Sequence, residues 1–158
     1  MPKPRHLVDL AATATRLAAT TDLWEALVDY DPVSRYYARL ALTPTHEAWL
    51  LTWVPGQGTD WHDHGGSAGA FVVVRGSLTE EHARLEGEDE AVVASTRQLP
   101  TGSVRPFGTR HIHRVTNTDL EPAVSIHVYA PALTRMNGYV REGDRLRLVE
   151  SRLAGVSW

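Results

Sequence analysis

The chain has 158 residues, of which 42% are hydrophobic, and this is enough for one domain with a sizeable core. With a formal net charge of -3 it lacks the basic excess of a nucleic-acid-binding protein, so no nucleic-acid partner is expected. The absence of cysteine excludes disulfides, thiolate metal ligands and a cysteine nucleophile. No apolar run approaches the ~20 residues that cross a bilayer, and no signal peptide is visible, which predicts a cytoplasmic protein without a membrane partner.

The N-terminal segment, residues 1–31, is predicted to be helical. Leucine, alanine and tryptophan recur at helix-like spacing between Leu7 and Tyr30. Thr20-Thr21-Asp22 offers N-cap chemistry for a second helix, and Asp31-Pro32 ends the region. We therefore expect one or two helices that pack on the part of the chain that follows.

Residues 35–151 carry a different pattern, in which short β-forming runs lie between Gly, Pro, Asn and Asp breaks. The predicted strands are Arg35–Leu42, Ala48–Val54, Ala70–Arg75, Leu78–Arg84, Glu90–Leu99, His111–Asn117, Ala123–Tyr129 and Leu146–Ser151. Many short strands with regular turns indicate a mainly β fold, either an antiparallel barrel or a sandwich. With no internal repeat or linker, residues 1–158 are predicted to form a single domain, and we expect a monomer.

The segment from Gly56 to Gly76 contains two histidines, His62 and His64, one residue apart. In a strand such residues point to the same face, so both imidazoles can bind one metal ion. Without further context, an ordinary surface pair is the alternative interpretation. His113 lies in a second segment punctuated by glycine and proline and is a candidate third ligand. The remaining histidines outside these segments are expected to be surface residues, namely His6, His46 and His82.

The spacing of these residues resembles the two motifs of the cupin superfamily. Gly56 is followed by five residues and then His62-Asp63-His64, with Gly76 closing the first motif. Pro106-Phe107-Gly108 followed by His113 and, four residues later, Asn117 resembles the second motif. The resemblance spans residues 50–130 and implies a small, jelly-roll-like antiparallel β-barrel with a metal at its centre.

The third ligand and the missing fourth ligand are the two open points of this resemblance. His111 competes with His113, because alternation puts both on one face, but the spacing to Asn117 favours His113. Most metal cupins also carry a glutamate ligand where this chain has Gly69. Three neutral imidazoles leave a ferrous ion with its full charge and favour an anionic ligand from the substrate, for which a thiolate is suitable.

Ser125, His127 and Tyr129 alternate on one predicted strand and therefore share a face. They resemble the Ser-x-His-x-Tyr relay of cysteine dioxygenases, in which serine and histidine orient a tyrosine hydroxyl beside the iron. The run from His113 to Asn117 resembles the His-Arg-Val-x-Asn of the same family. The alternative interpretation is a packed strand whose polar atoms satisfy one another.

Tyr37-Ala38-Arg39 resembles the Tyr-x-Arg with which the cysteine-specific branch of that family holds the substrate carboxylate. A guanidinium can bind a carboxylate bidentately. The related 3-mercaptopropionate dioxygenases usually carry glutamine at the arginine position, so Arg39 is predicted to discriminate between the substrates. Arg35 and Tyr36 offer a competing register.

The chain is thus similar to the cysteine dioxygenase (type I) family, in a bacterial form with glycine where eukaryotic members cross-link a cysteine to the tyrosine. This implies Fe(II) held by His62, His64 and His113, and oxidation of L-cysteine by O2 to cysteine sulfinic acid. Two alternatives stay open. One is a dioxygenase for another small thiol such as 3-mercaptopropionate, and the other is a non-catalytic cupin that binds Zn(II) or Ni(II).

Overall fold

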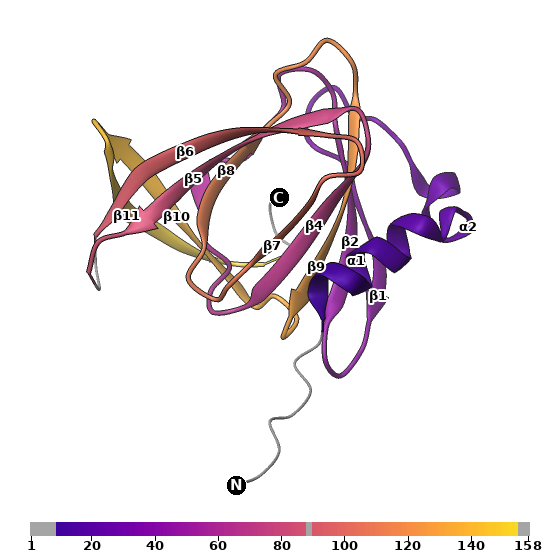
Figure 1. Ribbon diagram of the computed structural model, residues 1–158, viewed down its shortest axis with the longest axis horizontal. Coiled ribbons are helices and arrows are strands. Elements are labelled where there is room, and N and C mark those ends of the chain that lie inside the picture. Colours follow the sequence, from indigo (N-terminus) through magenta and orange to yellow (C-terminus); the bar gives the residue numbers. More distant parts are fainter. Residues whose placement is uncertain (1–8, 88–89, 155–158) are drawn as a thin grey trace, which may run out of the picture.

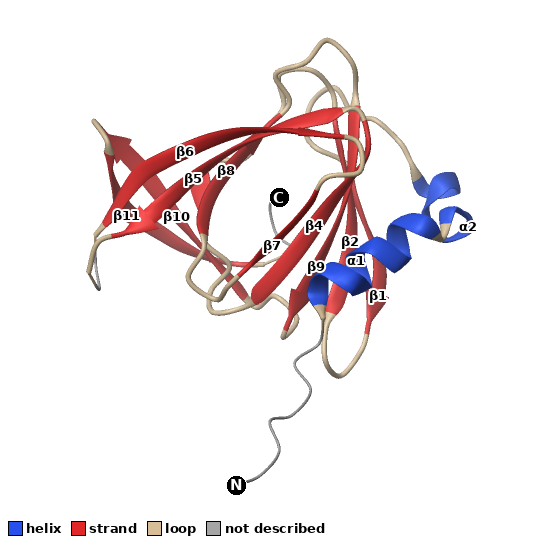
Figure 2. Cartoon of the chain, in the orientation of Figure 1, coloured by secondary structure: helices blue, strands red, loops and turns tan. Residues whose placement is uncertain are grey.

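The computed structural model of the protein describes residues 9–87 and 90–154 (Figure 1). Its N-terminal helical segments are α1 (Leu10–Ala19), α2 (Thr21–Trp24) and the 3-10 helix η1 (Glu25–Leu27). The strands are β1 (Tyr37–Leu42), β2 (Glu47–Trp53), β3 (Trp61–His62), β4 (Ala68–Arg75), β5 (Ser77–Leu85), β6 (Ala91–Pro100), β7 (Val104–Phe107), β8 (Ile112–Thr116), β9 (Ala123–Ala130), β10 (Arg135–Glu142) and β11 (Arg145–Leu153). The predicted mainly β fold with N-terminal helices is confirmed (Figure 2).

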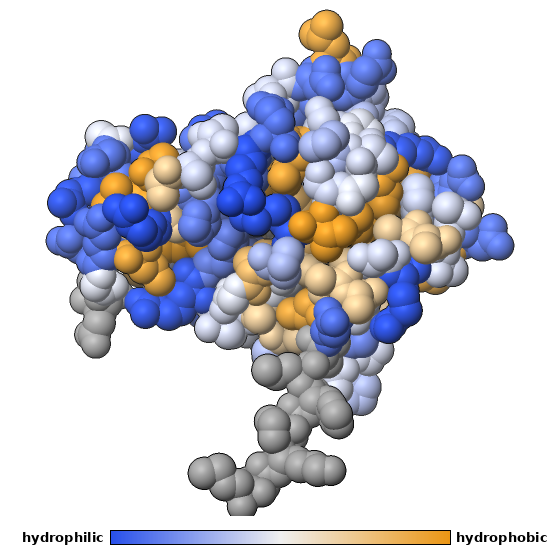
Figure 3. Space-filling model, in the orientation of Figure 1, coloured by the Kyte–Doolittle hydropathy of each residue, from blue (hydrophilic) through white to orange (hydrophobic). Residues whose placement is uncertain are grey.

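The strands form two antiparallel sheets that face each other across a common interior. One sheet has the order β1-β2-β9-β4-β7. The other runs β10-β11-β6-β5-β8-β3 and closes on itself through the pairing of β3 with β10. Buried apolar side chains from both sheets, among them Trp53, Phe71 and Leu78, form a core inside the barrel, and Figure 3 shows the outer surface in the same orientation. No helix in the described part of the chain has the length and apolar character needed to cross a membrane.

The helices cover the outer face of the five-stranded sheet (Figure 1). Asp9 caps α1 by accepting a hydrogen bond from the Ala12 N–H at 3.0 Å, and the buried Ala14 packs against the apolar residues of β4 and β9. The predicted helix start at Leu7 lies outside the described residues. Thr20 does not form the predicted side-chain cap, because its hydroxyl donates to the Arg16 carbonyl at 2.7 Å.

Each of the eight predicted strands overlaps an observed one, and three further strands were missed. β7 contains Pro106, β10 contains Gly138, and both residues weaken a strand pattern. β3 is only two residues long and ends at His62, so the expectation that His62 and His64 share one strand is wrong.

The central strand β9 is buried on both faces, and alternation divides its side chains between two cores. Val124, Ile126 and Val128 belong to the core between sheet and helix. Ser125, His127 and Tyr129 are buried and point the other way, and Tyr129 packs in the core inside the barrel. Polar side chains of β9 are thereby directed into the barrel interior.

Gly69 on β4 lies against Phe107 on β7, with which it is paired in register. A Cβ at Gly69 would lie 2.3 Å from Phe107 Cζ and 2.9 Å from the Val128 carbonyl oxygen. The position at which most metal cupins carry glutamate is therefore filled here by an aromatic ring, and no side chain fits without displacing it.

We expect Gly69→Ala to lower the free energy of unfolding by about 1–3 kcal/mol, because the added methyl overpacks the core. Gly108→Ala is the matched control, since a Cβ there meets no heavy atom within 4 Å, and it should change stability by less than about 0.5 kcal/mol. Urea denaturation monitored by tryptophan fluorescence measures both. Equal stability of the two variants would contradict the close packing at Gly69.

Candidate metal centre

Three imidazoles converge inside the barrel from different parts of the chain. His62 ends β3, His64 follows it, and His113 lies on β8 directly opposite His62 in the strand register. All three side chains are buried, and one nitrogen atom from each lies within 4.8 Å of the other two. The Nε2 atoms of His62 and His113 are 3.1 Å apart. The structure therefore brings together the three histidines predicted as metal ligands.

A tight turn, rather than a strand, directs His64 into the cluster. Gly65 adopts a left-handed conformation with φ +59, and the Ser67 N–H donates to the His64 carbonyl at 3.1 Å. Asp63 points away and accepts hydrogen bonds from Tyr139 Oη at 2.6 Å and Asn137 Nδ2 at 2.9 Å. The anchored Asp63 holds the turn, so the neighbouring imidazoles can face the same point.

Hydrogen bonds at Nδ1 determine which nitrogen atoms of His62 and His113 are free. His62 Nδ1 lies 2.8 Å from the Asp60 carbonyl oxygen, which can only accept, so Nδ1 carries the proton. His113 Nδ1 lies 2.8 Å from Glu80 Oε2 and donates to it in the same way. Burial, together with the neighbouring His113, lowers the pKa of His62 well below its ordinary value, and burial lowers the pKa of His113 to about 4. Both rings are therefore neutral, with the Nε2 lone pairs directed at each other.

This arrangement fits a bound cation. Two lone pairs 3.1 Å apart repel each other, whereas a shared ion with metal–nitrogen distances of about 2.0–2.1 Å accommodates adjacent ligand atoms at this spacing. His64 Nδ1 is buried without a hydrogen-bond partner among the described residues. One nitrogen atom of His64 belongs to the convergent cluster, so coordination to a metal would add a stabilising interaction to this buried ring.

The described ligand cluster of His62, His64 and His113 contains no carboxylate. Glu80 also lies close to His113, but its carboxylate is engaged by hydrogen bonds. One oxygen accepts from Arg105 Nε at 2.7 Å, and the other accepts from His113 and lies 3.4 Å from His111 Nε2. Burial alone would raise the pKa of Glu80, but hydrogen bonds from His111, His113 and Arg105 hold it well below its usual range.

Glu80 therefore orients His113 from behind as an ionised carboxylate, a role that sequence inspection missed. His111, the competing third ligand, contacts Glu80 instead of joining the three convergent nitrogen atoms. Its ring stacks on Phe107 at 4.9 Å and on His82 at 4.8 Å between centroids. The sequence contained no signal for Glu80, since its burial depends on β8, which pairs with β5 from far along the chain.

Ser125, His127 and Tyr129 form a buried hydrogen-bonded row beside the histidine cluster. Trp53 Nε1 donates to Ser125 Oγ at 2.8 Å, and Ser125 Oγ lies 2.7 Å from His127 Nε2. Trp53 Nε1 can only donate, so Ser125 Oγ accepts from the indole and keeps its own proton and a second lone pair for His127 Nε2. Burial lowers the pKa of His127 to about 3, which keeps the ring neutral.

The Tyr129 hydroxyl oxygen lies 3.4 Å from His127 Nδ1 at the other end of the row. Burial raises the pKa of Tyr129, so the phenol keeps its proton. Its ring centroid lies 5.4 Å from that of His64. Trp53 thus anchors one end of the row, and a protonated phenol lies at the other end beside the cluster.

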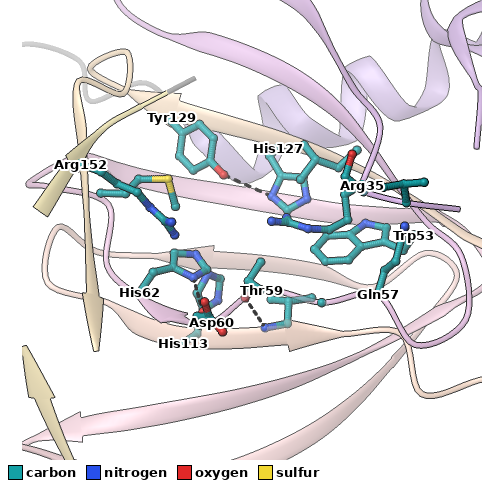
Figure 4. Close-up of a pocket in the computed structure, with 16 residues that line it drawn as sticks. Arg35, Trp53, Gln57, Thr59, Asp60, His62, His113, His127, Tyr129 and Arg152 are labelled. Carbon is teal, nitrogen blue, oxygen red and sulfur yellow. Dashed lines mark hydrogen bonds between the residues drawn. The ribbon is translucent and has the colours of Figure 1, made fainter. Parts of the chain in front are cut away.

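A cavity of about 290 Å³ opens next to His62 and His113 and is also lined by His127 and Tyr129 (Figure 4). Arg35, from the segment before β1, reaches into it with its guanidinium 5.0 Å from the Trp53 ring centroid. Within the described part of the chain, Arg35 makes no hydrogen bond or ion pair. Burial lowers its pKa to about 10, with a smaller opposing contribution from Tyr129. A charged guanidinium therefore faces the cavity without a hydrogen-bonded or ion-paired carboxylate in the described part of the chain.

The structure does not bring Arg39 or Tyr37 to this cavity. Both lie on the edge strand β1, where the exposed Arg39 sits 5.6 Å from the Trp49 ring centroid and Tyr37 packs edge-on against the same ring. Val33, Ser34 and Arg35 line the cavity just before β1 begins at Tyr37, whereas Arg39 on β1 does not. The competing register noted in the sequence is the one that reaches the site.

Solved structures with the same fold are cupins and related proteins. The TT1209 protein from Thermus thermophilus superposes with a TM-score of 0.58 at 20% identity, covering 68% of this chain and 93% of that one. A conserved protein with a double-stranded β-helix domain from Klebsiella pneumoniae gives 0.57 at 17% identity, with 80% and 93% covered. A cupin superfamily protein from Desulfitobacterium hafniense gives 0.55 at 10% identity, with 68% and 87% covered. The barrel is a cupin barrel with a three-histidine cluster at its centre.

Within this class, residues 6–142 match the family model of cysteine dioxygenase type I. The chain belongs to the cysteine dioxygenase type I family, and the resemblance found in the sequence is confirmed. Membership implies dioxygenase chemistry in general and agrees with a metal site built from three histidines.

We expect Glu80→Gln to weaken metal binding by about 10- to 100-fold, because an amide orients His113 less strongly than an ionised carboxylate. Glu81→Gln is the control, since its carboxylate pairs with Arg114 and Arg141 instead of with a histidine of the cluster. Competition with a chelator of known affinity measures the binding of iron(II) or zinc(II). Unchanged affinity in Glu80→Gln would show that Glu80 does not support the site.

Proposed function

We propose that this protein is an iron(II)-dependent thiol dioxygenase that oxidises a small carboxylate-bearing thiol such as L-cysteine to the sulfinic acid. The observation that carries the proposal is the unpaired guanidinium of Arg35 in the cavity beside three neutral imidazoles. A largely buried charge is unfavourable without a partner, and a carboxylate is the anion that a guanidinium binds bidentately. This geometry favours a substrate with a carboxylate at one end.

The three histidines suit the sulfur end of such a substrate. Iron(II) held by these imidazoles would supply the redox-active centre at which a thiolate and dioxygen react. Because no protein carboxylate neutralises the site, an anionic thiolate is favoured over a neutral thiol. The overall reaction is R–SH + O2 → R–SO2H, in which two S–O bonds form and the O–O bond breaks. Sulfur supplies the four electrons that dioxygen takes up, so no other reductant is needed.

The other residues of the cavity position the substrate. Arg35 would hold the carboxylate, and Trp53 supports the guanidinium through its ring face. Tyr129 would donate a hydrogen bond into the reacting region from the row that begins at Trp53. Leu51 and Val115 contribute apolar wall, which reduces access of water and strengthens the interaction of Arg35 with an anion.

Oxygen uptake tests the proposal directly. The protein is loaded with iron(II) without oxygen and then supplied with air and L-cysteine, 3-mercaptopropionate or cysteamine. We expect uptake with the carboxylate-bearing thiols and a product that contains two added oxygen atoms by mass. Tight zinc binding and no uptake with any thiol would favour the non-catalytic metal-binding cupin.

Arg35→Gln should lower kcat/KM for L-cysteine by about 10- to 100-fold, the loss typical of a hydrogen bond to a charged group. Cysteamine, which lacks the carboxylate, should be affected much less. Arg39→Gln is the matched control, because Arg39 is a nearby arginine outside the cavity. Steady-state oxygen consumption gives the comparison. A larger loss of kcat/KM for L-cysteine in Arg39→Gln than in Arg35→Gln would show that Arg39, and not Arg35, binds the substrate carboxylate.

Tyr129→Phe should lower kcat by about 10-fold or more while leaving KM nearly unchanged, since the hydroxyl is proposed to act after the substrate is bound. Tyr30→Phe serves as the control, because Tyr30 is exposed and does not line the cavity. A change confined to KM would assign Tyr129 to substrate binding alone.

A further inference from the structure

A second arginine lines the same cavity as Arg35. Arg152 lies on β11, and in Figure 4 its guanidinium and that of Arg35 reach the cavity from opposite sides and point toward each other, with Tyr129 above the gap and His62 below it. The two arginines come from segments at opposite ends of the chain. The cavity therefore has cationic groups on two walls.

Arg152 keeps hydrogen-bonding capacity for a ligand. Its one ion pair within the described residues joins Nη1 to Glu150 Oε1 at 3.4 Å, longer than a strong charge-assisted hydrogen bond, and the Glu150 side chain is 52% exposed. Its Nε is buried with no hydrogen-bond partner there. Glu150 itself does not line the cavity. A buried guanidinium nitrogen without an acceptor marks a place where a carboxylate would be favourable.

The charge around the cavity is mostly positive. Asp60 is the only described acidic residue that lines it, and this exposed side chain offsets part of the positive charge. Glu80 lies behind His113 and is neutralised by its ion pair with Arg105. Two guanidinium groups and neutral imidazoles give an excess of positive charge before any divalent cation is added. A thiolate and a single carboxylate would offset only part of this charge.

We propose that Arg152 binds a second anionic group of the substrate, so that the preferred class is a small thiol carrying two carboxylates. This inference rests on the proposed function, because it places the sulfur at the histidine cluster and one carboxylate at Arg35. The second carboxylate then lies at Arg152 on the opposite wall. The reaction is unchanged, since one dioxygen adds to the thiol sulfur and both carboxylates remain intact.

Mercaptosuccinate and 3-mercaptopropionate form a matched pair that differs by one carboxylate. Wild-type protein loaded with iron(II) should bind mercaptosuccinate at least about tenfold more tightly in calorimetry without oxygen. Arg152→Gln should abolish this preference and leave the affinity for 3-mercaptopropionate within about twofold. Arg152→Lys keeps the cation and should retain part of the preference, which also tests the site if Arg152→Gln unfolds. Arg147→Gln on the same strand is the control and should leave the preference unchanged.

Equal affinity for the two thiols in the wild type would overturn the proposal. Equal losses for both thiols in Arg152→Gln would also overturn it, because Arg152 and Arg35 would then share one carboxylate. Oxygen uptake with the same two thiols separates this question from the proposed function. A binding preference that depends on Arg152, without oxygen uptake by any thiol, would refute the dioxygenase while supporting the second anion site.

Discussion

The site depends on holding buried, neutral imidazoles so that their nitrogen lone pairs converge. The Asp60 carbonyl and the Glu80 carboxylate each take the Nδ1 proton of one ring, and this leaves the Nε2 atoms of His62 and His113 facing each other at 3.1 Å. Burial prevents protonation from relieving the repulsion. A bound metal ion would relieve the repulsion between these lone pairs. The hydrogen bonds at Nδ1 therefore favour cation binding at the Nε2 atoms.

The central strand β9 directs side chains into two different cores. Alternate residues of β9 pack under the helices, while Ser125, His127 and Tyr129 face the interior. Trp53 on the neighbouring strand anchors this row by donating to the serine. The guanidinium of Arg35 faces the same space from the segment before β1. Two histidines of the cluster, the phenol of Tyr129 and the guanidinium of Arg35 thus surround one small cavity.

Local patterns in the sequence could predict the barrel and the histidine cluster, because strand periodicity and motif spacing are properties of short segments. They could not place the arginine. Whether Arg35 or Arg39 lines the cavity depends on where the first strand begins. Because β1 begins only at Tyr37, Arg35 precedes the strand and lines the cavity, whereas Arg39 lies on the edge strand outside it. Glu80 was missed for a similar reason, since its burial and its contact with His113 arise from pairing between distant strands. His64 was found by spacing, but a turn rather than a strand directs it.

The direct test of whether three histidines bind iron(II) and leave a position for the thiol is X-ray absorption spectroscopy of the iron(II)-loaded protein, recorded without oxygen before and after addition of L-cysteine. We expect three imidazole ligands in both states and a sulfur ligand that appears only when the thiol is present. Fewer than three imidazoles, or an iron environment that the thiol leaves unchanged, would contradict it.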